Sequence, residues 1–246
     1  MKIALLGAES TGKTQLATAL AQALRERGHS VCLVAEHLRD WVEQHGRVPL
    51  QSEQLAIAQE QARRVNASDA AQIAGWAFTI ADTTPLMTAV YSHKLFADRS
   101  LYPMALSHQA SYPITLLMGL DIAWVADGLQ RDGPQVREPV DALLRQALDA
   151  AALPYHVVYG SGPARLQAAL QALEGAMQTP YDGAADATKK IAVNALFTSP
   201  AGQNTSENMV WKWVCDKCSD PQCEHRLFSQ LLIAEPRSAA TAHPAQ

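Results

Sequence analysis

The most informative part of the sequence is Gly7-Ala8-Glu9-Ser10-Thr11-Gly12-Lys13-Thr14. It has the form G-x-x-x-x-G-K-T, which is the phosphate-binding P-loop pattern. Residues 2–6 before it form a short apolar run, typical of a buried strand. Residues 15–27 after it repeat leucine at helical spacing. A strand, a glycine loop and a helix in this order are the context that separates a P-loop from a chance glycine loop.

The residues of this loop suit a nucleoside triphosphate. Glycines let successive backbone N–H groups turn inward around a phosphate, and the following helix adds the partial positive charge of its N-terminus. We expect Lys13 to reach the β- and γ-phosphates of ATP and the Thr14 hydroxyl to bind Mg²⁺. The predicted nucleotide contacts are Gly7, Glu9, Ser10, Thr11, Gly12, Lys13 and Thr14.

The composition is that of a globular chain with no marked affinity for polyanions. Its 246 residues allow one large domain or one domain with an appendage, and 48% of them are apolar, enough for a core. Glu9 interrupts the apolar start too early for a secretory signal, and no uncharged stretch is long enough to span a bilayer. We therefore expect a cytoplasmic protein without membrane contact. The net charge of -4 and the lack of a basic stripe argue against nucleic-acid binding.

Apolar runs and helical patterns alternate along the first 177 residues. The expected strands are 2–6, 31–35, 76–81, 112–120 and 155–159, and the expected helices are 15–27, 37–45, 51–71, 85–96, 139–151 and 164–177. This alternation predicts the α/β class: a P-loop NTPase with a parallel five-stranded sheet and helices on both faces. Phosphate chemistry in such a sheet lies at the carboxyl ends of the strands, where Glu36 and Asp82 fall.

Several stretches beyond the P-loop carry a resemblance to a known family. They are Glu36-His37-Leu38-Arg39-Asp40, Asp82-Thr83-Thr84-Pro85-Leu86-Met87-Thr88, Trp124-Val125-Ala126-Asp127-Gly128-Leu129 and Pro154-Tyr155. With them, residues 1 to about 175 resemble the nicotinamide riboside kinase domain of bacterial NadR-type proteins, a P-loop kinase family with AAA-like ATPase relatives. The resemblance implies an ATP-dependent phosphotransferase of NAD biosynthesis that acts on a nucleoside 5′-hydroxyl, with nicotinamide riboside as the first acceptor to consider.

Two positions depart from the pattern of that family. Thr84 stands where members often carry an acidic residue, and Ala35 where some place an aromatic side chain that stacks on the nicotinamide ring. Both positions belong to the nucleoside pocket and neither belongs to the ATP-binding loop. The resemblance therefore supports ATP-dependent phosphoryl transfer better than it supports nicotinamide riboside as the acceptor.

Two carboxylates are the expected centre of the reaction. Asp82 is expected to hold Mg²⁺ through water, opposite Thr14, and the alternative is a cap on the following helix. Related nucleoside kinases use a carboxylate at the position of Glu36 to orient or deprotonate the acceptor hydroxyl. The alternatives for Glu36 are a helix N-cap or an ion pair with Arg39. Arg39 is expected either to contact a phosphate or to hold Glu36.

The polar segment 125–138 reads as a loop that serves as a lid. Its Arg131 and Arg137 are expected to close on the γ-phosphate as charge moves in the transition state, and the alternative is two solvated surface arginines. Trp124 either packs against a base or closes the end of a strand. The predicted substrate contacts are Glu36, Arg39, Thr84, Trp124 and Asp127.

A Cys-rich segment follows the kinase-like domain of residues 1–177. We interpret 178–208 as a linker, 209–233 as a metal module and 234–246 as a disordered tail. The four candidate ligands of the module are Cys215, Cys218, Cys223 and His225. Cys₃His is a standard structural Zn²⁺ set, and the alternatives are an iron–sulfur site, a redox pair or ordinary thiols. This appendage motivates a second hypothesis, a regulatory or accessory ATPase whose nucleotide state controls contact of the module with a protein partner.

Overall fold

The structure is a computed structural model that describes residues 1–72, 77–125 and 134–178. Its strands are β1 (Lys2–Leu6), β2 (Val31–Val34), β3 (Phe78–Asp82), β4 (Ile114–Met118) and β5 (His156–Val158). Its α-helices are α1 (Lys13–Glu26), α2 (His37–His45), α3 (Gln54–Gln72), α4 (Pro85–Phe96), α5 (Tyr102–Gln109), α6 (Arg137–Ala150) and α7 (Gly162–Gln178). Two short 3₁₀ helices, η1 (Gln51–Glu53) and η3 (Pro134–Val136), precede α3 and α6.

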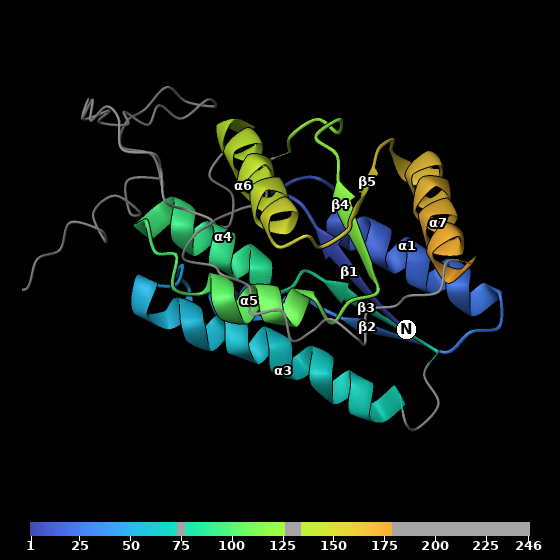
Figure 1. The fold of residues 1–246 in the computed structure, drawn as a ribbon, viewed down its shortest axis with the longest axis horizontal. Coiled ribbons are helices and arrows are strands. Elements are labelled where there is room, and N and C mark those ends of the chain that lie inside the picture. The colour runs from blue at the N-terminus through green and yellow to red at the C-terminus, as the bar shows by residue number, and fades with distance from the viewer. Residues whose placement is uncertain (73–76, 126–133, 179–246) are drawn as a thin grey trace, which may run out of the picture. The chain divides into compact units, whose positions relative to one another are not determined.

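The five strands form one parallel sheet in the order β2-β3-β1-β4-β5 (Figure 1). The central strand β1 therefore has β3 on one side and β4 on the other. Leu5 lies opposite Asp82, and Leu6 lies opposite Leu117. This register places the loop that follows Leu6 between the carboxyl ends of β3 and β4, which confirms the predicted architecture.

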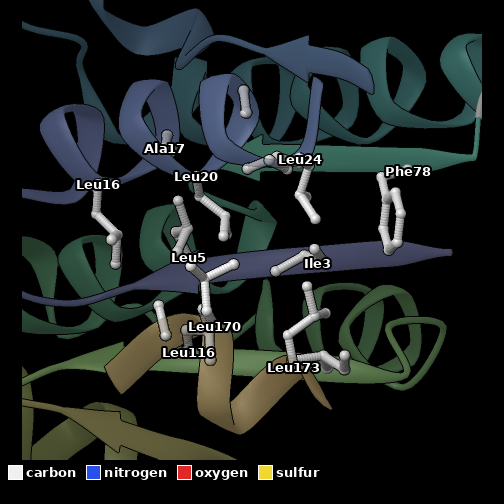
Figure 2. Close-up of a cluster of buried hydrophobic side chains, with 14 of the residues drawn as sticks. Ile3, Leu5, Leu16, Ala17, Leu20, Leu24, Phe78, Leu116, Leu170 and Leu173 are labelled. Carbon is white, nitrogen blue, oxygen red and sulfur yellow. The ribbon is translucent and has the colours of Figure 1, made fainter. Parts of the chain in front are cut away.

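One face of the sheet is covered by α1 and α7. Side chains alternate across a strand, so Ile3 and Leu5 of β1 point to this face. Figure 2 shows them between the leucines of α1 and those of α7. The helix residues of this layer include Leu16, Ala17, Leu20, Leu24, Leu170 and Leu173, all buried. This apolar layer fixes α1, and with it the P-loop, against the sheet.

Helices α3 to α6 cover the other face. Leu6 and Leu117 belong to a second buried cluster with apolar side chains of α4, α5 and α6. The fully buried members on these helices include Leu86, Val90, Tyr102, Leu106, Val140 and Leu144. Tyr102 is the largest of these side chains. This layer brings α3 and α4 beside the strand ends that carry the candidate site (Figure 1).

The differences from the predicted elements are local. Helix α1 begins at Lys13, two residues before the predicted start, because Gly12 takes a left-handed conformation with φ 78° and leads directly into the helix. Helix α5 was not predicted, since its eight residues contain Pro103 and show no clear apolar stripe. The predicted loop 125–138 is wrong at its end, where η3 leads into α6 at Arg137.

The predicted Cys-rich module falls outside the described residues. Cys215, Cys218, Cys223 and His225 all lie beyond residue 178, as do the predicted tail and nearly all of the linker. Within residues 1–72, 77–125 and 134–178, no group of three or more His, Cys, Asp or Glu side chains is arranged to hold a metal. In the same residues, no helix is both long and apolar enough to span a bilayer.

Candidate functional site

Two glycines set the path of the P-loop. At Gly7, φ is +151°, and a Cβ atom there would lie 2.8 Å from Cβ of Met118 on β4. At Gly12, φ is +78°, and Ser10 between them also has a positive φ, of +54°. Residues other than glycine rarely adopt such φ values, and the Met118 side chain already fills the space beside Gly7. The close approach of the loop to β4 therefore requires the glycines of the motif.

The loop is also braced by its own side chains. The Thr11 hydroxyl donates to the Ala8 carbonyl at 2.7 Å, and Thr11 is buried. The Lys13 ammonium donates to the carbonyl oxygens of Gly7 at 2.8 Å and Ala8 at 3.0 Å. These contacts keep the lysine over the loop, at the end of the sheet.

Lys13 lies within electrostatic reach of both predicted carboxylates. Burial lowers the pKa of Lys13, and the nearby charges of Glu36 and Asp82 act in the opposite direction. An opposite charge must be close to shift a pKa. Lys13, Glu36 and Asp82, which follow β1, β2 and β3, therefore lie near one another at this edge of the sheet. Glu9 contributes in the same sense and is itself buried.

The end of β3 carries polar atoms without partners. Asp82 is 4% exposed, and its Oδ1 atom has no hydrogen-bond partner in the described part of the chain. The next residue, Thr83, has a φ of +93°, and its hydroxyl also lacks a partner among the described residues. A buried, unpaired carboxylate oxygen is costly, and backbone strain of this kind clusters at functional sites. Oxygen ligands of this type fit Mg²⁺.

The helix that follows Asp82 is capped by Thr84. The Thr84 hydroxyl accepts from the Leu86 amide at 3.3 Å and donates to Oε1 of Gln109 at 2.7 Å. The capping alternative for Asp82 is therefore wrong. Thr84 is completely buried and does not belong to the pocket described next, so its hydroxyl is engaged inside the protein instead of facing a substrate.

A small pocket of about 20 Å³, with room for about one water molecule, lies beside these strand ends, between α2, α3 and α4. Its lining residues are Glu36, Leu38, Gln54, Ile57, Gln61, Thr83, Met87, Thr88 and Tyr91. Glu36 is the residue before α2, but its side chain makes no capping hydrogen bond. Its carboxylate instead accepts from Nε of Arg39 at 2.9 Å. The structure thus brings Glu36 and Thr83 into one pocket. Asp82, the residue before Thr83, does not line it.

On the other side of the P-loop lies the segment that follows β4. The Val125 amide donates to the Ser10 hydroxyl at 2.8 Å, and that hydroxyl donates to the Val125 carbonyl at 3.2 Å. The indole Nε1 of the neighbouring Trp124 is buried and has no partner in the described residues. Trp124 therefore precedes a residue that is bonded to the P-loop, and it is not among the residues that line the Glu36 pocket. Asp127 and Arg131 fall outside the described residues.

Arg137 is buried at the start of α6. It is 7% exposed, and its Nη1 donates to the Ile122 carbonyl at 2.7 Å. Its Nε and Nη2 have no partner among the described residues. The alternative of a solvated surface arginine is therefore wrong for Arg137. The interpretation of this position as part of a loop is also wrong, because Arg137 is the first residue of α6.

A second buried arginine, Arg165 of α7, connects the P-loop to Asp121, which follows β4. It is 3% exposed and donates to the Thr11 carbonyl and, through Nη2, to Oδ1 of Asp121 at 2.6 Å. The other Asp121 oxygen accepts from the Gly160 amide at 2.5 Å. Burial lowers the pKa of Arg165, Asp121 opposes this shift, and the charge of Arg137 adds to it. The two arginines are therefore electrostatic neighbours.

Asp121 and Arg165 were missed in the sequence. Glu36 and Asp82 stand out because polar residues just after parallel strands meet at one edge of the sheet. The same reasoning points to Asp121 after β4 and Arg165 after β5. Neither residue stands in a recognisable motif. The pairing of Asp121 with Arg165, 44 residues apart, appears only in the folded chain.

Comparisons with known proteins support the fold. The crystal structure of a NadR protein in complex with NR aligns with a TM-score of 0.60 and 19% sequence identity, covering 72% of this chain. Since 52% of the NadR chain is covered, this chain spans about half the length of that protein. The thymidylate kinase from Ehrlichia chaffeensis aligns with a TM-score of 0.52 and 16% identity, covering 71% of this chain and 97% of the kinase. At such identities the likeness shows a P-loop kinase-like fold.

Among curated proteins, none matches the chain. A family model described as an AAA domain matches residues 2–165, a range that holds the P-loop, Glu36, Asp82 and Arg165. The match covers more than half of the chain and takes in all five strands. The chain therefore belongs to the AAA domain family of P-loop proteins.

Proposed function

We propose that the protein is an ATP-dependent kinase that phosphorylates the 5′-hydroxyl of a nucleoside, with nicotinamide riboside, giving NMN, as the first acceptor to test. One observation carries the proposal. Lys13 of the P-loop lies in electrostatic reach of both Asp82 and Glu36, and Glu36 lines a pocket at the same strand ends. A kinase needs this arrangement, because the triphosphate and the acceptor must meet in line.

The P-loop residues have the roles of the nucleotide site. The main chain from Gly7 to Thr14 would cradle the phosphates, Lys13 would pair with them and the Thr14 hydroxyl would be a magnesium ligand. The unpaired Oδ1 of Asp82 supports a role as a carboxylate that holds the metal through water. Bound Mg²⁺ would supply charge neutralisation between the β- and γ-phosphate oxygens. Arg137 has unpaired N–H groups beside this site and is proposed, with Arg131, to counter the charge that develops on the γ-phosphate.

The residues that line the pocket include few groups that could neutralise a phosphate. Of its nine lining residues, all within the described part of the chain, Glu36 alone is charged, and none is Lys or Arg. A monophosphate acceptor needs cationic groups that neutralise its phosphate, for which arginine is the usual choice. An alcohol needs only a group that orients or removes its proton, which is the role proposed for Glu36. Because Arg39 binds the Glu36 carboxylate at 2.9 Å, a cation stands beside this lining, and both a nucleoside and its monophosphate are acceptors to test.

A second candidate function is an accessory ATPase, and one observation favours it. Nε of Arg39 donates to the Glu36 carboxylate at 2.9 Å, so the group proposed to take the proton of the substrate hydroxyl already has a partner. In this version, nucleotide occupancy controls a protein partner that binds the Cys-rich segment, with Zn²⁺ on Cys215, Cys218, Cys223 and His225. Metal content of the purified chain, compared with that of a Cys215→Ser variant, tests the zinc site by itself.

A substrate panel separates the two candidates. Nicotinamide riboside, the common nucleosides and their monophosphates are incubated with Mg-ATP, and ADP release and phosphorylated product are measured. The kinase predicts ADP release that one nucleoside stimulates, with matching formation of its 5′-phosphate. Slow ADP release that is indifferent to all acceptors would favour the accessory ATPase. Phosphorylation of a monophosphate in preference to its nucleoside would contradict the proposed acceptor class.

A further inference from the structure

The side chain of Gln61 bridges the turn that carries Glu36. Gln61 lies on α3, is 2% exposed and lines the same pocket. Its Oε1 atom accepts from the His37 amide at 2.7 Å, and its Nε2 atom donates to the Ala35 carbonyl at 3.3 Å. These are the main-chain groups on either side of Glu36. One side chain from a distant helix therefore holds both flanks of this residue.

The chemistry of the turn explains why an amide is used. Ala35 follows the last residue of β2, so its carbonyl lies beyond the strand ladder. His37 is the first residue of α2, where N–H groups have no partner within the helix. The turn thus offers one acceptor and one donor, and an amide side chain supplies one of each. A carboxylate supplies only acceptors, and an apolar side chain supplies neither.

The side chain of Glu36 has a different and weaker support. Its carboxylate pairs with Arg39, whose side chain is 43% exposed. Ion pairs this exposed hold a geometry weakly because water and salt compete with them. The two bonds from Gln61 are part-buried, but they come from a side chain that is only 2% exposed and they go to main-chain atoms, so water competes with them less. The position of the Glu36 backbone is therefore fixed better than the direction of its carboxylate.

We infer that Gln61 is a positioning residue for phosphoryl transfer, which holds Glu36 at the edge of the pocket where the acceptor hydroxyl must lie. The inference rests on the proposed function, since it gives Glu36 a reacting group to orient. Gln61 touches neither phosphate nor reacting hydroxyl in this role. It acts through the main chain of residues 35–37, with Arg39 completing the hold on the carboxylate.

The first test removes the bridge and leaves the helix in place. Gln61→Met keeps the length of the side chain and loses both hydrogen bonds, while Gln61→Glu keeps an acceptor for the His37 amide and loses the donor. We expect Gln61→Met to lower kcat by about 30-fold, since a misplacement of about 1 Å costs up to about 100-fold. The KM for ATP should stay within about twofold, and Gln61→Glu should lose at least as much activity as Gln61→Met, because its buried carboxylate would face the Ala35 carbonyl oxygen.

Ser68→Ala is the matched control on the same helix. Ser68 is 8% exposed, its hydroxyl donates to the Val65 carbonyl at 2.6 Å, and it does not line the pocket. Losing one buried hydrogen bond on α3 should leave kcat unchanged. An equal loss of kcat in Ser68→Ala and Gln61→Met would overturn the inference, because it would show general damage to the helix.

A double-mutant cycle shows whether Gln61 acts through Glu36. In a Glu36→Gln background, Gln61→Met should cause almost no further loss of kcat, because there is no carboxylate left to position. The same 30-fold loss in both backgrounds would overturn the inference. Hydrogen exchange adds a readout that needs no turnover: the His37 amide should exchange faster in Gln61→Met, and unchanged exchange would count against the bridge.

The outcomes also separate this inference from the proposed function. Wild-type protein that phosphorylates no nucleoside would overturn both. Active wild-type protein with an unaffected Gln61→Met variant would overturn the inference alone and leave the kinase proposal standing.

Discussion

The P-loop and the acceptor pocket lie at the same edge of the sheet but are built in different ways. The P-loop is local: eight consecutive residues supply its glycines, its lysine and its internal hydrogen bonds. The pocket is assembled from α2, α3 and α4, and its geometry depends on side chains that meet only in the fold. The P-loop should therefore tolerate little change, whereas single substitutions in the helices can alter the geometry of the acceptor pocket.

The largest effect is expected at Lys13. Lys13→Ala removes the ammonium that pairs with the transferred phosphate, and we expect phosphoryl transfer to fall by about 10³-fold or more. Circular dichroism should show an unchanged fold, because the hydrogen bonds of Lys13 within the described residues go to carbonyl groups of the loop itself. Lys94→Ala on α4 is the control and should keep full activity. If Lys13→Ala kept turnover within tenfold of the wild type, the P-loop would not have the dominant role assigned to it here.

Asp82→Asn is expected to separate activity from stability. The Oδ1 atom of Asp82 is buried without a partner, so removing its charge should leave the melting temperature equal or higher. We expect kcat to fall by about 100-fold and the magnesium concentration for half-maximal activity to rise. Kinetics at varied magnesium and thermal melts measure both effects.

Asp141 gives the matched control for this substitution. It is also buried, but it accepts from Nε of Arg145 at 2.7 Å. Asp141→Asn should therefore destabilise the fold, by about 1 kcal/mol, and spare kcat. If Asp82→Asn lost as much stability as Asp141→Asn, the carboxylate of Asp82 would have a structural role instead of a metal-holding one.

A smaller effect is expected at Arg165, which ties α7 to the P-loop. Arg165→Lys keeps the charge but cannot reach the Thr11 carbonyl and Asp121 in the same geometry. We expect ATP to bind about tenfold more weakly by calorimetry, with little change in the KM of the acceptor. Arg27→Lys, in an exposed pair with Glu174, should change neither. A change confined to the KM of the acceptor would show that the contacts of Arg165 support the pocket instead of the P-loop.

The smallest expected effect concerns the stability of the fold at high pH and comes from Tyr102, which packs in the same buried cluster as α4. Burial raises the pKa of Tyr102 to about 12 from an ordinary value of 10.0. The folded state then keeps this proton where the unfolded state loses it, so stability is intact below pH 10 and falls as the pH rises towards 12. The slope is about 1.4 kcal/mol per pH unit for this one group. Urea unfolding at pH 9 to 11 should show this loss, and Tyr102→Phe should lack it.

The same contrast explains how much could be predicted from the sequence. The P-loop, the order of strands and helices, and the positions of Glu36 and Asp82 follow from patterns within short stretches. Arg137 was expected in a polar loop, because nothing in segment 125–138 signals that its side chain is buried against Ile122. Gln61 had no signal at all, since its importance lies in two main-chain atoms 24 and 26 residues away. Contacts of this kind arise only from packing between elements.

Thr83 has a consequence for how this site can change over time. A β-branched residue at φ +93° is strained by about 1–3 kcal/mol, so glycine there should make the protein more heat-resistant. Glycine would also let the end of β3 move and would loosen the carboxylate beside it. Selection of random variants for survival at high temperature should therefore enrich replacements at position 83, and the survivors should be poor catalysts.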